Sequence, residues 1–288
     1  MIYIISIVFA ILILSVIAII YHDMNHFVVR NYEIHSDKIK KDAVFCLLSD
    51  LHEKQFGEGN SELLKAIDKI SPDIILIAGD LLTAFNESGQ DHYEEIGDFV
   101  AKLCSRYPVY AANGNHEYKM DLLGGHRKEV YTKYAKKITD AGCVHLRNTG
   151  TYLEDYNMEI HGLELGYEYF RKVVKRPMPE NHIEQYFGKP CESRFQLLIA
   201  HNPIYFEDYV KWGADLTVSG HVHGGIIRIP FIGGVISPAM VLFPKYDGGL
   251  FELTNKKMVL SRGLSTHSVP IRFNNPGELC VIKIISDK

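Results

Sequence analysis

The chain has few cysteines and no arrangement of them that indicates a covalent or metal framework. Its five cysteines are far apart in the sequence, form no Cys-x-x-Cys pair and are odd in number. This pattern argues against a disulfide framework and against a cysteine zinc site. We therefore expect the cysteines to be small apolar residues of the core.

An excess of one charge is also missing. The 288 residues include 31 Lys and Arg against 35 Asp and Glu, which gives a formal net charge of -4. Such a chain has no overall basic field, so no nucleic-acid partner is expected. Repeats, low-complexity tracts and later linkers are absent as well, and 47% of the residues are hydrophobic. The simplest division is one folded domain over residues 43–288, with enough apolar residues for a large core.

Residues 1–20 contain no charged side chain. At ~1.5 Å per residue this stretch is about 30 Å long as a helix, which is enough to cross the core of a bilayer. A cleaved signal peptide is the alternative, although neither a positive first segment nor a small-x-small cleavage site is clear. We predict a membrane anchor over residues 1–21 and a polar juxtamembrane connector over residues 22–42. The protein is then a single-pass membrane protein.

Basic residues follow the predicted anchor but do not precede it: they are Arg30, Lys38, Lys40 and Lys41. The positive-inside rule therefore favours a cytoplasmic domain. Three of the four charges lie near the limit of the range over which this rule acts, so the face of the membrane stays open.

Short continuous apolar runs alternate with helical patterns in the first half of the domain. The runs cover 43–50, 73–80 and 109–117, and the helical patterns cover 61–70, 92–106 and 129–140. Runs of this kind are typical of strands buried on both faces. Short strands and turns follow, around 143–163 and from 226 to 285. The order predicts an α/β fold, a layered sandwich of two mixed sheets with helices outside.

Metal-ligating side chains follow five of the predicted strands. They are Asp50, His52, Asp80, Asn115, His201, His221 and His223. Sites form at the carboxyl ends of strands, and oxygen and imidazole ligands without sulfur suit Zn, Fe, Mn or Co. Residues i and i+2 of a strand point to the same face, so each pair within Asp50-x-His52 and His221-x-His223 can enter one cavity. Singly, each residue could be a turn, a strand cap or a surface side chain; five such blocks together indicate a metal site.

The series resembles the calcineurin-like metallophosphoesterase superfamily. The matching blocks are Asp50-x-His52, Gly79-Asp80, Gly114-Asn115-His116-Glu117, His201 and Gly220-His221-x-His223. More narrowly, the chain resembles a membrane-anchored branch in which the last block precedes a proline-containing hairpin, here with Pro230 and Pro238, and a closing "SRGL…PIRF" segment within 261–279. Some members hydrolyse UDP-diacylglucosamine or simpler phosphodiesters. Departures occur at Val222, Ile226 and Ser265, which put only substrate contacts in doubt.

The resemblance implies two divalent metal ions, Mn, Fe, Zn or Co. Asp50, His52 and His223 would hold the first, Asn115, His201 and His221 the second, and Asp80 would bridge them. Two metals roughly 3.5–4 Å apart can hold a hydroxide and clamp the phosphoryl oxygens. His116 is placed to protonate or hydrogen-bond the leaving oxygen. Glu117 could orient it or be solvated.

The implied function is a membrane-anchored dinuclear-metal phosphoesterase that cleaves a phosphodiester or pyrophosphate of a lipid-linked or nucleotide substrate. A phosphomonoesterase or protein phosphatase of the same fold, and a non-catalytic metal-binding scaffold, are the alternatives. Arg272 is predicted to contact a substrate phosphate, because Arg suits phosphate bidentately. The basic run 170–176 is either a solvated face or a contact for anionic lipid or diphosphate.

Overall fold

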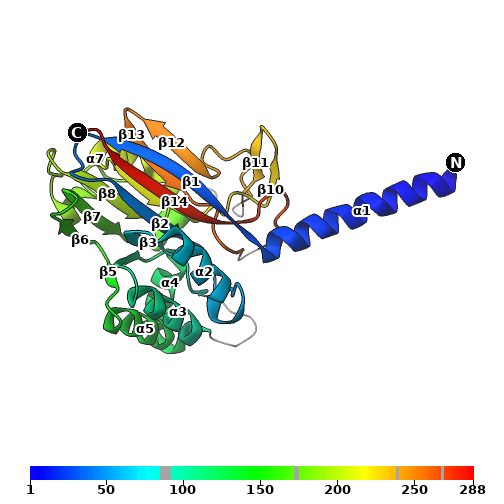
Figure 1. Cartoon of the computed structure of the whole chain (residues 1–288), viewed down its shortest axis with the longest axis horizontal. Coiled ribbons are helices and arrows are strands. Elements are labelled where there is room, and N and C mark those ends of the chain that lie inside the picture. The colour runs from blue at the N-terminus through cyan, green and yellow to red at the C-terminus, as the bar shows by residue number, and fades with distance from the viewer. Residues whose placement is uncertain (85–91, 172–174, 238–239, 267–268) are drawn as a thin grey trace.

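The computed structural model of the protein describes residues 1–84, 92–171, 175–237, 240–266 and 269–288. Two six-stranded sheets pack face to face, with helices on their outer faces (Figure 1). Both sheets are mixed, since each contains parallel and antiparallel neighbours. The predicted α/β sandwich of two mixed sheets flanked by helices is confirmed.

The first sheet has the strand order β1-β14-β2-β3-β4-β5. Its strands are β1 (Phe27–Ser36), β14 (Gly277–Ser286), β2 (Ala43–Leu48), β3 (Ile74–Ala78), β4 (Val109–Ala112) and β5 (Val144–Leu146). From β2 to β5 the neighbours are parallel, and such pairs need crossover connections. The crossovers contain the helices η1 (Glu58–Asn60), α2 (Ser61–Ile70), α3 (Tyr93–Cys104), α4 (Asn115–Leu123) and α5 (Gly125–Asp140).

The second sheet has the order β12-β13-β9-β8-β7-β6. Its strands are β12 (Gly249–Leu253), β13 (Lys256–Leu260), β9 (Leu216–Ser219), β8 (Phe195–Ala200), β7 (Met158–Leu163) and β6 (Thr149–Leu153). Short helices connect them: η2 (Tyr167–Phe170), α6 (Glu184–Phe187), η3 (Pro203–Tyr205) and α7 (Phe206–Trp212). A separate hairpin pairs β10 (Ile227–Ile229) with β11 (Gly233–Ile236).

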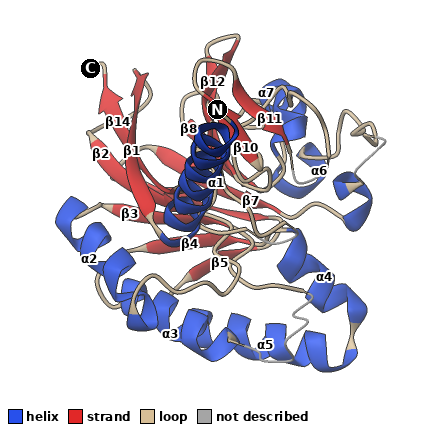
Figure 2. Ribbon diagram, turned by 90° about the vertical axis from the view of Figure 1, so that its right-hand side faces the viewer, coloured by secondary structure: helices blue, strands red, loops and turns tan. Residues whose placement is uncertain are grey.

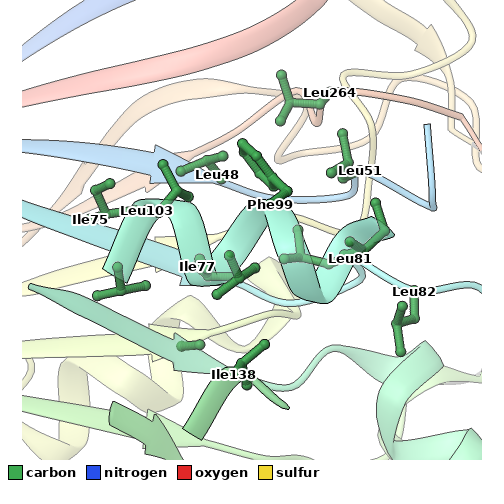
Figure 3. Close-up of a cluster of buried hydrophobic side chains, with 14 of the residues drawn as sticks. Leu48, Leu51, Ile75, Ile77, Leu81, Leu82, Phe99, Leu103, Ile138 and Leu264 are labelled. Carbon is green, nitrogen blue, oxygen red and sulfur yellow. The ribbon is translucent and has the colours of Figure 1, made fainter. Parts of the chain in front are cut away.

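The core lies on both faces of the first sheet. Between the sheets, Phe45 and Leu76 pack in one cluster with Leu197 and Val218 of the second sheet. On the outer face, Phe99 of α3 packs with the sheet residues in a second cluster (Figure 3). Strands β3, β4, β8 and β9 are buried along their whole length, as predicted from their continuous apolar runs. Their rigid ends can therefore support a precise site.

The segment 22–42, predicted as a polar connector, contains strand β1, which pairs in parallel with β14 over ten residues from Phe27↔Gly277 to Ser36↔Ser286. The strand lies at the edge of its sheet and keeps many polar, partly exposed side chains, which hid it from sequence reasoning. The first sheet thus begins before residue 43.

Helix α1 (Ile2–Asn25) projects from the body of the molecule (Figure 1) and points toward the viewer in Figure 2. It is long and apolar enough to cross a membrane, and its apolar stretch is not buried by the rest of the protein. A signal sequence near the N-terminus can meet the same criteria of length and composition.

Candidate metal centre

Five loops bring the predicted ligands together at one end of the two sheets. Three follow the parallel neighbours β2, β3 and β4 of the first sheet, and two follow the parallel neighbours β8 and β9 of the second. The two sets meet: His201 Nε2 lies 2.9 Å from Asp80 Oδ2, and the backbone N–H of His221 donates to Asp50 Oδ1 at 3.0 Å. The site therefore spans the two sheets.

The ligand atoms form two adjacent groups. Asp50, His52 and His223 make one, and Asp80, His201 and His221 make the other; within each, the atoms lie within 4.8 Å of one another. Asp80 Oδ2 lies 3.9 Å from His52 Nε2 as well as 2.9 Å from His201 Nε2. The Asp80 carboxylate thus borders both groups.

The backbone at these residues is unusual. Strand β2 ends at Leu48 and β9 ends at Ser219, so the ligands lie beyond the strands. Five ligand residues have positive φ, between 48° and 75°: they are Asp50, His52, Asp80, His221 and His223. The i, i+2 pairs do converge, but tight left-handed turns aim them, and the predicted strand alternation is wrong. Such backbone costs of order 1–3 kcal/mol per residue and is typical of functional sites.

Glycines allow the loops to approach closely. A Cβ at Gly114 would clash with the Asp80 carboxylate, and one at Gly220 would clash with Ser49 and Asp50. Only glycine fits where the backbone passes so near a ligand carboxylate.

Outer hydrogen bonds fix the orientation of two histidines. His201 Nδ1 lies 2.5 Å from the carbonyl of Ala78, and His223 Nδ1 lies 2.8 Å from the carbonyl of Ser265. A carbonyl only accepts, so each Nδ1 donates its hydrogen to its carbonyl, and in the neutral ring Nε2 is the nitrogen left to bind a cation. This is the arrangement of metal-ligating histidines.

The donor set fits cations. Asp50 and Asp80 are buried carboxylates, and the buried Asn115 Oδ1 accepts no hydrogen bond from the described residues. Burial lowers the pKa of His201, but Asp80 outweighs burial and raises this pKa to about 10. The pKa of His221 falls to about 3 through burial and the neighbouring His201 charge. The carboxylates of Asp80 and Asp50 therefore favour a neighbouring positive charge, and a divalent cation would supply it while leaving His201 neutral, as a ligand must be.

Comparison with known proteins now identifies the family. The family model for calcineurin-like phosphoesterases matches residues 43–225. The chain belongs to the calcineurin-like phosphoesterase family. It is therefore a metal-dependent phosphoric ester hydrolase.

Several relatives match most of the chain at low identity. An uncharacterized metallophosphoesterase of Bacillus subtilis, YkuE, is 24% identical over 83% of this chain and 77% of its own length. Phosphodiesterase YaeI of Escherichia coli is 24% identical over 83% of this chain and 80% of its own. A transmembrane protein with metallophosphoesterase domain from Danio rerio is 22% identical over 81% of this chain and 51% of its own.

His116 of the phosphoesterase lies beside the ligands, with its ring 4.8 Å from the ring of His52. The backbone N–H of Ala84 donates to His116 Nδ1 at 2.9 Å, so the neutral ring has its hydrogen on Nε2. Burial lowers the pKa of His116, which favours this neutral form. Of the two predicted roles, protonation of the leaving oxygen and hydrogen bonding to it, a neutral ring favours hydrogen-bond donation from Nε2–H. His116 also forms a ligand-like group with His52 and Asp80, so its role needs a test.

Glu117 neither orients His116 nor lies in solvent. Its buried carboxylate accepts from the backbone N–H groups of Asp80, Leu82 and Gly114 at 2.9–3.1 Å. Burial, together with the negative Asp80, raises its pKa to about 7. Glu117 thus ties the loop after β3 to the loop after β4.

Arg272, the predicted substrate contact, is only 1% exposed. Its guanidinium donates to the carbonyls of Arg262, Gly263, Ser265 and Asn275. Burial lowers its pKa to about 10. Ser265 O is the carbonyl that also accepts from His223, so Arg272 braces a metal ligand. Its two terminal nitrogens thus donate to backbone carbonyls, and its buried Nε has no hydrogen-bond partner among the described residues.

Sequence reasoning missed two further neighbours of the site. Asn275 donates to the carbonyls of His223 and Gly225 at 2.8 and 2.7 Å, and Phe170 has its ring 5.1 Å from the His221 ring. Asn275 acts through backbone carbonyls and Phe170 through its ring, so neither belongs to a motif that sequence could reveal.

Two predicted features fall partly outside the described residues. They are residues 172–174 of the basic run 170–176 and Pro238 of the predicted hairpin. A cavity of about 710 Å³ between α6 and α7 contains none of the site residues.

Proposed function

We propose that the protein is a membrane-anchored dinuclear phosphoesterase that hydrolyses a phosphodiester or pyrophosphate bond. The observation that carries this proposal is the pair of adjacent ligand groups with the Asp80 carboxylate between them. Asp50, His52 and His223 would hold one divalent cation. The other would bind Asn115, His201 and His221, and Asp80 would contact both. Mn, Fe, Zn and Co all accept these ligands.

A pair of divalent cations supplies a water nucleophile near neutral pH and charge stabilisation of the phosphoryl oxygens. The chain's own residues then orient the ester. His116, held by the N–H of Ala84, would donate a hydrogen bond from its Nε2–H to the oxygen that leaves, and that oxygen would take its proton from solvent. Glu117 fixes the two loops that position Asp80 and His116, so the donor and the cations keep their relative placement.

The substrate we propose has an apolar or nucleotide arm. Phe170 supports this, because its partly buried ring borders His221 and offers a surface for an acyl chain or a base. Helix α1 supports a substrate that is reached at a membrane. The name of the Escherichia coli relative, phosphodiesterase YaeI, favours a diester over a monoester.

Metal content and activity of the full chain in lipid nanodiscs test the proposal. We expect two bound Mn ions per chain in the wild type and fewer in His52→Ala. His35→Ala is the control, since His35 is an exposed histidine of β1 outside both ligand groups. Substrates to compare are a bis-aryl phosphodiester, an aryl phosphomonoester and a UDP-sugar lipid. One ion per chain in the active wild type refutes the dinuclear site, and preference for the monoester refutes the substrate class.

A further inference from the structure

An exposed apolar patch lies on the β10–β11 hairpin and on the turn that follows it. Its residues are Ile229, Phe231, Ile232, Met240, Val241, Leu242 and Phe243. Phe231, at the hairpin turn, is fully exposed, and Ile232, Leu242 and Phe243 are 60–64% exposed. Soluble monomers rarely expose a continuous patch of this kind, and such patches mark interaction surfaces.

The two parts of the apolar patch form one unit. The backbone N–H of Phe243 donates to the carbonyl of Val235 in β11 at 2.8 Å. In addition, Ile236 forms an antiparallel bridge with Leu242. Residues 242–243 are therefore held against β11 by their backbone, and the apolar side chains of residues 240–243 lie beside those of the hairpin.

The surface of this unit is uncharged. Across residues 226–243 the sequence has a single charged side chain, Arg228. That guanidinium is turned inward, where it donates to the carbonyls of Gly224 and Asp247 at 2.7 Å. The exposed part of the hairpin and its following turn is therefore apolar and carries no charge.

The patch is joined to the end of α1 through segment 273–275. On one side, the carboxylate of Asp23 in the last turn of α1 accepts from the backbone N–H of Asn275 at 2.7 Å. On the other, Arg228 of β10 donates its backbone N–H to the carbonyl of Phe273 at 3.0 Å. Figure 1 shows β10 and β11 beside the base of α1, and Figure 2 shows them on the face from which α1 projects. The apolar helix and the apolar patch thus lie on the same side of the molecule.

We propose that the apolar patch docks on the lipid bilayer that α1 crosses, as a second membrane contact; this inference rests on the membrane anchor of the proposed function. Exposed Phe, Ile and Leu side chains enter the boundary between headgroups and acyl chains because burial there removes apolar area from water. A domain anchored by a single helix can change its orientation relative to the membrane. Contact at α1 and at the patch fixes its orientation.

Docking also bears on the metal centre. Chain 223–227 runs directly from His223 into β10, and Asn275 bonds the carbonyls of both His223 and Gly225. The ligand loop is therefore part of the membrane-contacting unit. A substrate embedded in the bilayer would meet the site at a fixed height and orientation.

The test uses the full chain in nanodiscs, with tryptophan reporters and lipids brominated near the top of the acyl chains. The reporters are Phe231→Trp in the patch, Phe9→Trp in α1 and, as the matched control, Tyr152→Trp on β6, which lies at the far end of the molecule from α1 (Figure 1). The emission of Trp212, the single native tryptophan, is subtracted with the wild type. We expect bromine to quench the reporters at 231 and 9 and to leave the one at 152 unquenched.

Each other outcome separates the two proposals. Quenching at 9 without quenching at 231 overturns the docking inference and leaves the anchor standing. Quenching at neither position overturns the anchor, and the docking inference falls with it. A blue-shifted emission at 231 without bromine quenching means that protein covers the patch, as in a dimer, and overturns the lipid contact.

A second measurement asks whether the patch itself supplies the affinity. With Leu242→Trp as reporter, Phe231→Ser should shift the docking equilibrium by about tenfold, since burial of one large apolar side chain is worth that factor or more. Bromine quenching of the reporter should fall accordingly. Turnover of a water-soluble bis-aryl phosphodiester should stay unchanged, which shows that the variant is folded. Unchanged quenching would overturn the inference.

Discussion

Arg272 provides the sharpest test of the site, because two readings of it predict different kinetics. Arg272→Met keeps much of the apolar stem and removes the charge and the donors. Among the described residues, the carbonyls of Arg262 and Asn275 accept only from this guanidinium. The carbonyl of Gly263 also accepts from the backbone N–H of Glu278, and the carbonyl of Ser265 also pairs with His223. The substitution therefore leaves two buried carbonyls without a donor.

The expected loss of stability can be worked out from those two carbonyls. An orphaned buried acceptor costs about 1–3 kcal/mol, so we expect the free energy of unfolding to fall by about 2–4 kcal/mol once water enters part of the space. A loss of this size lowers Tm by roughly 5–10 °C in a domain of this length. The matched control is Arg194→Met, because Arg194 is a partly exposed arginine that pairs with Glu159 outside the site. The control should change stability by less than about 1 kcal/mol.

Metal affinity should fall in the Arg272→Met variant as well. Arg272 holds the Ser265 carbonyl that orients His223, and loss of such an outer partner typically weakens metal binding by about 10–100-fold. The assays are thermal unfolding, metal titration, and kinetics at low and saturating Mn. We expect activity to recover at saturating Mn with little change in KM. A raised KM with unchanged Tm and metal affinity would refute this reasoning and restore the substrate contact.

Three further variants and one truncation probe the remaining assignments. Asp80→Asn should lose bound metal and activity, because the carboxylate borders both ligand groups; elemental analysis checks this, and an active metal-free variant would contradict it. His116→Ala should keep its metal yet slow turnover by about 10²–10⁴-fold, whereas loss of metal would make His116 a ligand. Phe170→Ala should raise KM for a bis-aryl diester more than for a dimethyl diester, and equal effects would remove Phe170 from the substrate arm. Without residues 1–21 the chain should leave the membrane fraction, and retention in carbonate-washed membranes would contradict the anchor.

The layered architecture could be predicted because burial leaves a direct trace in the sequence. Strands such as Ile74–Ala78 and Phe195–Ala200 are covered on both faces, so nearly every position is apolar and the run is continuous. Strand β1 shows where this signal fails. At a sheet edge, side chains such as Asn31 and Glu33 stay exposed, and the segment has the composition of a polar linker. It pairs with β14, at the other end of the chain, and no local sequence pattern can reveal such a long-range contact.

The ligands could be predicted for a different reason. A metal ligand must have one of a few side-chain types, so Asp50, His221 and their partners are visible in the sequence as soon as several follow strand ends. The groups that hold those ligands have no such restriction. His201 and His223 are oriented by backbone carbonyls, which every residue has. The turns that aim the ligands depend on positive φ at residues other than glycine, which sequence does not reveal.

Arg272 could not be assigned from sequence, because its role depends both on tertiary packing and on contacts to backbone carbonyls. Its type suggested a phosphate contact, since a guanidinium binds phosphate and carbonyl oxygens with the same donors. Burial of the side chain decides between them, and the packing of residues 262–266 and 269–275 against the rest of the site sets that burial. A phosphate-binding arginine must keep part of its fork open to solvent until substrate arrives. Arg272 is buried and its terminal nitrogens donate to carbonyls, so we expect it to affect the reaction through the position of His223, which is why stability and metal affinity, rather than KM, are the quantities to measure.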